Sequence, residues 1–219
     1  MNKILTLFLI FSLTGCSSDK KGSPPSAPQS SLIEFDKLKG GFWQSECYPE
    51  PKNGKFQNTV ALFDLSDEGV PVMAMYTEIF EDDQCTQSLL GIIFGSRADL
   101  KQELNGEGQK IDLHMQIQKI YIFAEPVASL FNNESVCGKT DWVLDVEMGF
   151  SILGLSCPAT ESVNIGSVYG DGEVFSQILM IKDGKLYFGD TTTKTGKTDA
   201  LRPNTLDSHG LSFEAESLN

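Results

Sequence analysis

The sequence predicts an all-β domain, an antiparallel up-and-down barrel of about eight strands with one short helix. Three observations lead to this fold class. Short runs of apolar, β-branched and aromatic residues begin at about residue 38 and recur along the chain. Turn signals such as Asn53-Gly54 and Asp183-Gly184 separate these runs at spacings that suit hairpins. Residues 111–117 alternate between apolar and polar, which is the pattern of a strand with one buried face.

The chain begins with the pattern of a secretory signal peptide at residues 1–15. Lys3 supplies a positive start, and the apolar run from Ile4 to Leu13 is too short for a membrane-spanning helix. The small residues that end this run resemble, together with Cys16, the lipobox of bacterial lipoproteins, where cleavage leaves an acylated cysteine. The resemblance implies a lipid anchor, such as palmitate, on Cys16. The alternative is an ordinary secretory signal followed by a chance cysteine.

The residues after Cys16 indicate in which membrane the protein is anchored and what kind of linker follows the anchor. Ser17, and not an aspartate, follows Cys16, and the sorting pattern of bacterial lipoproteins then implies anchoring in the outer membrane of the cell envelope. The domain itself would face the periplasm or the cell surface. Residues 16–37 are expected to form a flexible linker, because small, polar and proline residues dominate most of that segment.

Four strands are expected before residue 105, at 41–48, 55–65, 70–81 and 89–95. Pro49 ends the first of them, because proline cannot donate to a strand ladder. Asn53-Gly54 and Asp67-Glu68-Gly69 supply the next two turns. A polar stretch that ends at Asn105-Gly106 is expected to connect the fourth strand to the next one.

The second half of the domain is expected to contain a strand at 111–123, a helix within 124–135, a strand at 142–150 and a hairpin of 178–182 with 185–188. Val127, Leu130 and Phe131 have the spacing of one apolar helix face. The hairpin turns at Asp183-Gly184, a pair that tolerates the positive φ angles of a tight turn. Residues 208–219 are expected to be a polar tail, which leaves 38–207 as the barrel domain.

Four cysteines remain once Cys16 is assigned to the anchor: Cys47, Cys85, Cys137 and Cys157. An even number in an oxidising compartment predicts two disulfides. Of the three pairings, the sequence-local ones are favoured, Cys47–Cys85 and Cys137–Cys157, each stabilising by about 3–4 kcal/mol on the loop-entropy model. A zinc site is the alternative, but the spacing of these cysteines is not that of zinc ligands. No metal or other cofactor is expected.

Charge and residue types narrow the function classes. The formal net charge is −13, and removal of residues 1–15, which carry only the charge of Lys3, leaves −14. Such a polyanion is a poor partner for nucleic acid. The two histidines, His114 on a polar strand face and His209 in the expected tail, have no evident nucleophile or acid–base partner. The protein is therefore not expected to be an enzyme.

Three residues are candidates for a ligand site inside the barrel. Met73 and Met75 lie in one expected strand, and their flexible thioethers suit an adaptable pocket, although core packing explains them equally well. Lys119 falls in phase with the buried row 111–117, where it would meet an anionic ligand. The favoured alternative is a β-bulge near Gln118 that places Lys119 in water and turns Ile120 and Ile122 inward.

The order of several short motifs resembles lipocalins, and in particular cysteine-bearing bacterial lipoproteins described as lipocalin-like. The motifs are Gly41-x-Trp43, Thr140-Asp141-Trp142 and the late Arg202. The resemblance spans roughly residues 40–207. It implies that Trp43 closes one end of the barrel, with Arg202 across its ring in a cation–π contact of about 1 kcal/mol. For Trp43, a packing role is favoured over ligand stacking.

Two functions stay open at this point, and an enzyme, the third hypothesis, is the least favoured because the sequence offers no plausible acid–base pair. In the first, the barrel binds a small apolar molecule at the envelope membrane. In the second, the barrel is filled, and its surface contacts an envelope protein or cell-wall component. An open interior would favour the first function, and an interior lined with large packed side chains the second.

Overall fold

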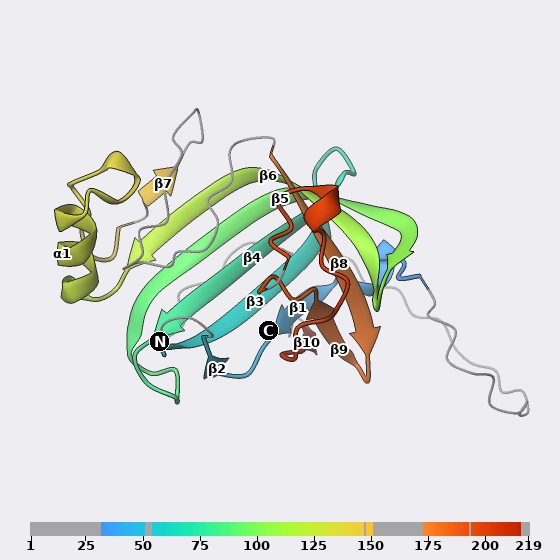
Figure 1. The fold of residues 1–219 in the computed structure, drawn as a ribbon, viewed down its shortest axis with the longest axis horizontal. Coiled ribbons are helices and arrows are strands. Elements are labelled where there is room, and N and C mark those ends of the chain that lie inside the picture. Colours follow the sequence, from blue (N-terminus) through green and yellow to red (C-terminus); the bar gives the residue numbers. More distant parts are fainter. Residues whose placement is uncertain (1–31, 51–53, 147, 151–172, 193, 216–219) are drawn as a thin grey trace, which may run out of the picture. The chain divides into compact units, whose positions relative to one another are not determined.

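The protein forms a closed antiparallel barrel of eight strands, which confirms the predicted fold class (Figure 1). The computed structural model describes residues 32–50, 54–146, 148–150, 173–192 and 194–215. The strands and helix of this part are β1 (Gly41–Gln44), β2 (Tyr48–Pro49), β3 (Phe56–Leu65), β4 (Pro71–Phe80), β5 (Ser88–Asn105), β6 (Gly108–Ile122), α1 (Glu125–Asn133), β7 (Met148–Phe150), β8 (Val174–Lys182), β9 (Lys185–Phe188) and β10 (Leu211–Ala215). Short 3-10 turns lie at Phe35–Lys37, Val136–Gly138 and Asp199–Leu201.

The barrel closes because β1 pairs on both of its edges. One edge pairs with β10 and the other with β3, so the ring runs β1-β10-β9-β8-β6-β5-β4-β3 and back to β1. β2 lengthens the sheet beside β3, and β7 pairs with β6 outside the ring. Closure leaves these eight strands without an exposed ring edge, which removes the aggregation risk of an open sheet.

The most important difference from the prediction lies at the C-terminal end. Part of the expected polar tail, Leu211–Ala215, forms β10 and pairs with β1 and β9. Leu211 is buried in the barrel core. The pattern was missed because only two large apolar residues, Leu211 and Phe213, alternate there between polar ones. The domain therefore extends beyond residue 207.

The N-terminal boundary also moves. Within the segment expected as a linker, Ile33 is buried, and its backbone N–H donates to the side-chain carbonyl of buried Gln109. Phe35 packs edge-on against Phe63, with ring centroids 6.2 Å apart. Leu38, which follows the 3-10 turn, is fully buried. Residues 33–38 therefore pack against the barrel core and are not part of a free linker.

Two predicted strands have different limits. β5 continues to Asn105 through the polar stretch that was expected to be a connection, because the ladder with β6 runs on as far as Asn105 opposite Gly108. Gly106 allows this tight turn: its φ is +61°, and a Cβ there would lie 1.9 Å from the carbonyl oxygen of Asn204. The first strand, expected at 41–48, is instead divided into β1 and β2.

The strand expected at 142–150 is reduced to β7. Trp142 lies outside it, because the side chain of Asn132 in α1 bonds both the N–H and the carbonyl of Trp142. The Trp142 indole packs at 89° to the ring of Phe131 and donates to the carbonyl of Val136. Trp142 thus joins the predicted helix, α1, to the hydrophobic cluster that it shares with β4, β5 and β6.

The buried hydrophobic side chains of the described residues form two clusters. The helix-side cluster joins α1 to β4, β5 and β6: Ile79, Leu90, Ile92, Ile120, Ile122, Ala128, Phe131, Val136, Cys137 and Trp142. The N-terminal cluster surrounds residues 33–38: Ile33, Leu38, Trp43, Ala61, Phe63, Met73, Ala98, Ile111, Leu113, Met115, Leu179, Leu186 and Leu211. Phe94 packs against both clusters, so it marks the place where they meet.

Ending the chain at Asp207 is expected to abolish cooperative unfolding, because loss of β10 exposes the edges of β1 and β9 and removes the buried Leu211 side chain. Thermal unfolding followed by far-UV circular dichroism measures this. A chain that ends at Ala215 is the control and should unfold like the full chain. A cooperative transition at an unchanged temperature in the shorter chain would contradict closure by β10.

Candidate functional site in the barrel interior

The interior faces of the strands can be assigned from the register. Residues directly opposite each other on antiparallel strands share a face. Trp43, Ala61, Met75, Phe94 and Gln118 are opposite one another on β1, β3, β4, β5 and β6. Because Trp43 and Ala61 belong to the N-terminal cluster, the whole set faces the barrel interior. We call these five residues the central row.

The bulge predicted in β6 is present and determines which residues face inward. Gly95 is opposite Ile117, whereas the next residue, Ser96, is opposite Met115, so Gln116 is the extra residue on β6. Before the bulge, Ile111, Leu113 and Met115 are buried; after it, Gln118, Ile120 and Ile122 are. The bulge lies two residues before the predicted position, and the predicted inward turn of Ile120 and Ile122 is confirmed.

The phase change places Lys119 on the outer face. It lies between the inward-facing Gln118 and Ile120, opposite Ile93 of β5, and is half-buried. A role for Lys119 inside the pocket, one of the two alternatives considered for it, is therefore excluded by the strand geometry.

Gln118 has an unusual environment. Its side chain is 0% exposed, and neither its amide oxygen nor its amide nitrogen has a hydrogen-bond partner in the described structure. Opposite it lies Phe94, and its neighbours along the inward face are Met115 and Ile120. Leaving a buried amide unpaired costs about 1–3 kcal/mol. A residue that carries such a cost in an apolar core calls for an explanation.

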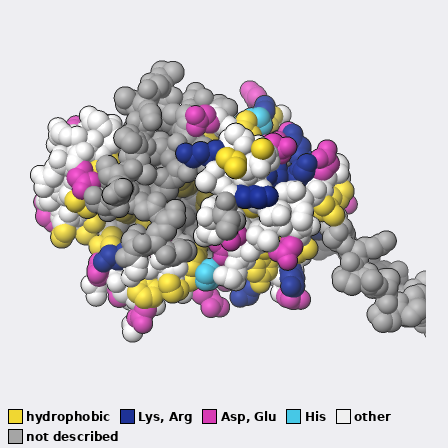
Figure 2. Space-filling view, viewed as in Figure 1, with side chains coloured by type: hydrophobic (Ala, Val, Ile, Leu, Met, Phe, Trp, Pro, Cys, Tyr) yellow, Lys and Arg dark blue, Asp and Glu magenta, His cyan; other side chains and the backbone are white. Residues whose placement is uncertain are grey.

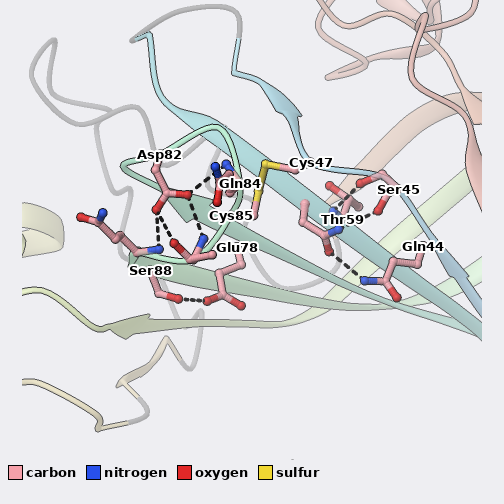
Figure 3. The surroundings of a disulfide bond; sticks show 12 residues. Gln44, Ser45, Cys47, Thr59, Glu78, Asp82, Gln84, Cys85 and Ser88 are labelled. Carbon is pink, nitrogen blue, oxygen red and sulfur yellow. Dashed lines mark hydrogen bonds between the residues drawn. A yellow bond between two sulfur atoms is a disulfide. The ribbon is translucent and has the colours of Figure 1, made fainter. Parts of the chain in front are cut away.

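Other polar groups on the inward faces are paired. Ser45 Oγ accepts the backbone N–H of Thr59 at 2.8 Å (Figure 3). The hydroxyls of Thr59 and Thr77 are 3.2 Å apart. Ser96 Oγ donates to the carbonyl of Met73 at 3.3 Å. Gln118 is therefore an exception among its neighbours.

Met73 and Met75 differ in their surroundings. Met73 is 2% exposed and packed into the N-terminal cluster, as a core residue is. Met75 faces the same way in the central row but is only half-buried, as are Phe94 and the inward-facing Thr77. These three inward-facing residues are therefore less completely covered than Met73.

Trp43 and Arg202 do not form the contact that the lipocalin resemblance implies. The Trp43 indole N–H donates to the carbonyl of Leu38 at 2.9 Å, and its ring packs on Phe213 with centroids 5.1 Å apart. Trp43 faces inward. Arg202 contacts Asp112, the outward neighbour of the buried Ile111, so it lies on the opposite side of the barrel wall. The predicted cation–π pairing is therefore wrong.

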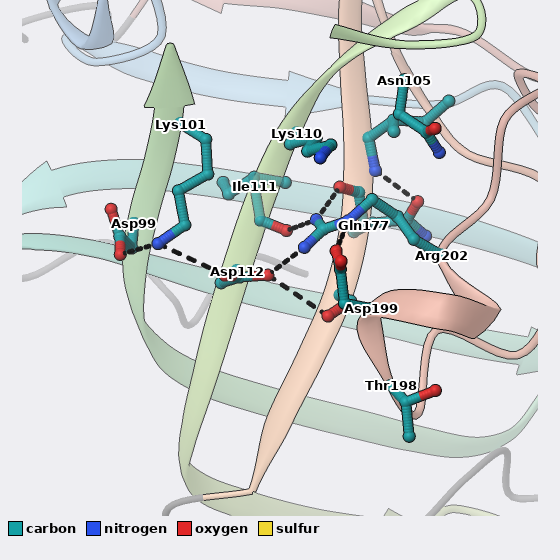
Figure 4. Close-up of polar contacts among 12 residues, drawn as sticks. Asp99, Lys101, Asn105, Lys110, Ile111, Asp112, Gln177, Thr198, Asp199 and Arg202 are labelled. Atoms are coloured by element: carbon teal, nitrogen blue, oxygen red, sulfur yellow. Dashed lines mark hydrogen bonds and ion pairs between the residues drawn. The ribbon is translucent and has the colours of Figure 1, made fainter. Parts of the chain in front are cut away.

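Arg202 instead attaches the segment after β9 to the outside of the barrel (Figure 4). It is 3% exposed, and its Nη1 donates at 2.7 Å to the carbonyls of both Ile111 and Gln177, which are paired on β6 and β8. Nη2 pairs with the Asp112 carboxylate, and Nε donates to Asp199 at 2.9 Å. This network joins the paired strands β6 and β8 on the outside of the barrel.

The pKa of Asp112 also reflects its place in this network. Burial raises the pKa of Asp112, but the hydrogen bond and positive charge of Arg202, together with Lys101, more than offset this, so the pKa lies below its ordinary value. The carboxylate is thus favoured in the folded protein.

One predicted disulfide is confirmed. Cys47 and Cys85 are bonded and join the segment between β1 and β2 to the turn between β4 and β5 (Figure 3). Asp82 orders that turn by accepting the backbone N–H groups of Gln84, Thr86 and Gln87. Cys137 is also disulfide-bonded. Its predicted partner, Cys157, lies outside the described residues.

His209 is also placed differently from the prediction. It was expected in a free tail, but its ring stacks on Tyr48 with centroids 4.1 Å apart, and its Nδ1 lies 2.9 Å from Asp207. These contacts tie the segment before β10 to β2.

A hollow of about 410 Å³ lies beside residues 33–35. It is lined by Ile33, Glu34, Phe35, Val70, Pro71, Arg97, Ala98, Asp99, Leu100 and Gln102. Charged and apolar side chains alternate in this lining, and the hollow is open to solvent. It therefore lacks the apolar enclosure that is typical of small-molecule sites.

The comparisons do not identify a relative. No protein-family model matches the chain, and no curated protein matches it significantly. Among the described residues, no helix is both long and apolar enough to cross a membrane. Figure 2 shows acidic and basic side chains interspersed over the visible face, with small apolar areas between them.

Gln118→Met is expected to raise the free energy of unfolding by about 1–3 kcal/mol, because it replaces an unpaired buried amide with an apolar side chain of similar shape. Urea unfolding measures the change. Gln116→Met is the matched control, because Gln116 is exposed at the bulge of the same strand, and its effect should be within about 0.5 kcal/mol of zero. Equal effects of the two substitutions would contradict an unpaired amide.

Asp112→Asn is expected to destabilise the protein more at neutral pH than in acid. The lowered pKa of Asp112 gives stability that is present above its unfolded-state pKa and lost as the pH falls through the folded-state pKa. Urea unfolding at about pH 7 and about pH 3 measures the difference from the wild type, which should narrow in acid. Asp67→Asn, in an exposed turn, is the control. A difference that is independent of pH would contradict the Asp112–Arg202 pairing.

Proposed function

We propose that this protein is a lipid-anchored envelope lipoprotein whose lipocalin-like barrel binds a small, mainly apolar molecule. The observation that supports binding is the central row, where Met75 and Phe94 face inward and keep accessible surface. Thioether and aromatic side chains are typical linings of small-molecule sites. The N-terminal pattern that ends at Cys16 supports the anchor.

The chemical character of the interior fits an apolar ligand. The side chains that face inward from β3, β4, β5 and β6 are all uncharged. The charged residues of these strands, such as Glu78, Arg97 and Asp112, fall on the outward positions. A charged ligand would lose its hydration without gaining an ion pair there, so a neutral molecule is favoured.

A second function has an observation of its own. The N-terminal cluster is densely packed, with Trp43 4% exposed and Phe63 1% exposed, as in a barrel filled by its own side chains. In that case the outer surface would contact an envelope protein or cell-wall component. The same packing is compatible with binding in the other half of the barrel, beside the central row.

The test is saturable binding of the neutral fluorescent probe N-phenylnaphthylamine to the full-length protein in detergent. Wild type is expected to bind in the interior, and Met75→Trp, which enlarges an inward-facing side chain of the central row, should weaken binding about tenfold or more. Ala74→Trp is the matched control, because Ala74 is the exposed outward neighbour. The melting temperature reports folding of each variant. Absence of saturable binding, or equal loss in both variants, would favour the filled barrel.

A further inference from the structure

We propose that Gln118 is the specificity residue of this interior site and that it selects a neutral ligand with an amide-type head group on an apolar body. The inference rests on the proposed function, and it names the ligand class. Its starting point is the fully buried amide with neither polar atom paired in the described structure.

The hydrogen-bonding groups of the Gln118 amide define which ligand head group pairs with it. A glutamine amide presents one carbonyl acceptor and an NH₂ donor side by side. A primary amide or a lactam presents the same pair in reverse, so it satisfies both groups of Gln118 at once. An ester or ketone satisfies only the donor, which leaves the carbonyl unpaired at a cost in affinity.

The charges around the site argue against a carboxylate. Lys119 lies on the outer face of β6, and Arg202 is engaged with Asp112 and Asp199 on the outside of the wall. No described cation thus lies on the inward face of β6. An ionised fatty acid would bring an uncompensated charge into an apolar interior, which costs much more than burying an amide.

The apolar body would lie along the central row. Met75 and Phe94 face inward, are only half-buried and lie in one register row with Gln118. The amide itself is sealed, so a ligand reaches it only when a covering side chain moves. We assign this movement to Phe94, because it lies directly opposite Gln118, and it packs against both clusters.

The experiment compares dodecanamide, methyl dodecanoate and dodecanoate at slightly alkaline pH, titrated into the full-length protein by calorimetry. These probes share one chain and differ in the head group. Wild type is expected to bind dodecanamide about tenfold more tightly than the ester, as one additional buried hydrogen bond implies, and dodecanoate more weakly still. Gln118→Met should remove the preference for the amide, and exposed Gln116→Met should keep it.

The outcomes separate the two proposals. If all three probes bind wild type equally, or if Gln118→Met retains the amide preference, the assignment of Gln118 is overturned while interior binding stands. If none of the probes binds and N-phenylnaphthylamine does not bind either, interior binding itself is overturned. Tighter binding of dodecanoate than of dodecanamide would show that a cation, and not the Gln118 amide, governs selection.

Discussion

The bulge at Gln116 is the feature on which the rest of the interior depends. If β6 ran on without a bulge, it would keep its initial phase, and Ile117 and Lys119 would follow Met115 on the inward face. Ile120 and Ile122 would then leave the helix-side cluster, and α1 would lose the apolar surface it covers. One inserted residue therefore joins two hydrophobic clusters on one continuous interior face and brings Gln118 between them.

The outer wall has a different source of stability from the interior. Inside, apolar packing dominates. Outside, the Arg202 guanidinium bonds carbonyls of both β6 and β8 and pairs with Asp112, and it holds the segment after β9 against these strands. The Cys47–Cys85 disulfide fixes the opposite side of the ring, where β1, β2 and the β4–β5 turn meet. The wall is thus held by polar and covalent contacts in addition to the packing of the interior.

Much of the barrel could be predicted from residue patterns, and the misses have physical causes. The Asp183-Gly184 hairpin and the bulge in β6 were both evident, the latter because an inward lysine is costly. β10 was missed because a short strand completed by its neighbours needs little apolar character of its own. The position of Arg202 was wrong because a motif order carries no information about which side of a wall a side chain lies on. Gln118 itself could have been found, since inward Ile120 and Ile122 imply an inward residue two positions earlier.

The most direct test of this account is the NMR signal of the Gln118 side-chain NH₂ group, assigned by comparison with Gln118→Met. A sealed, unpaired amide predicts two resonances that exchange slowly with water, at chemical shifts typical of NH groups without a hydrogen bond, and that move downfield when dodecanamide is added. The exposed NH₂ of Gln116 should exchange rapidly in the same spectrum. Rapid exchange of the Gln118 signals would contradict the inward position of this residue and the site built on it.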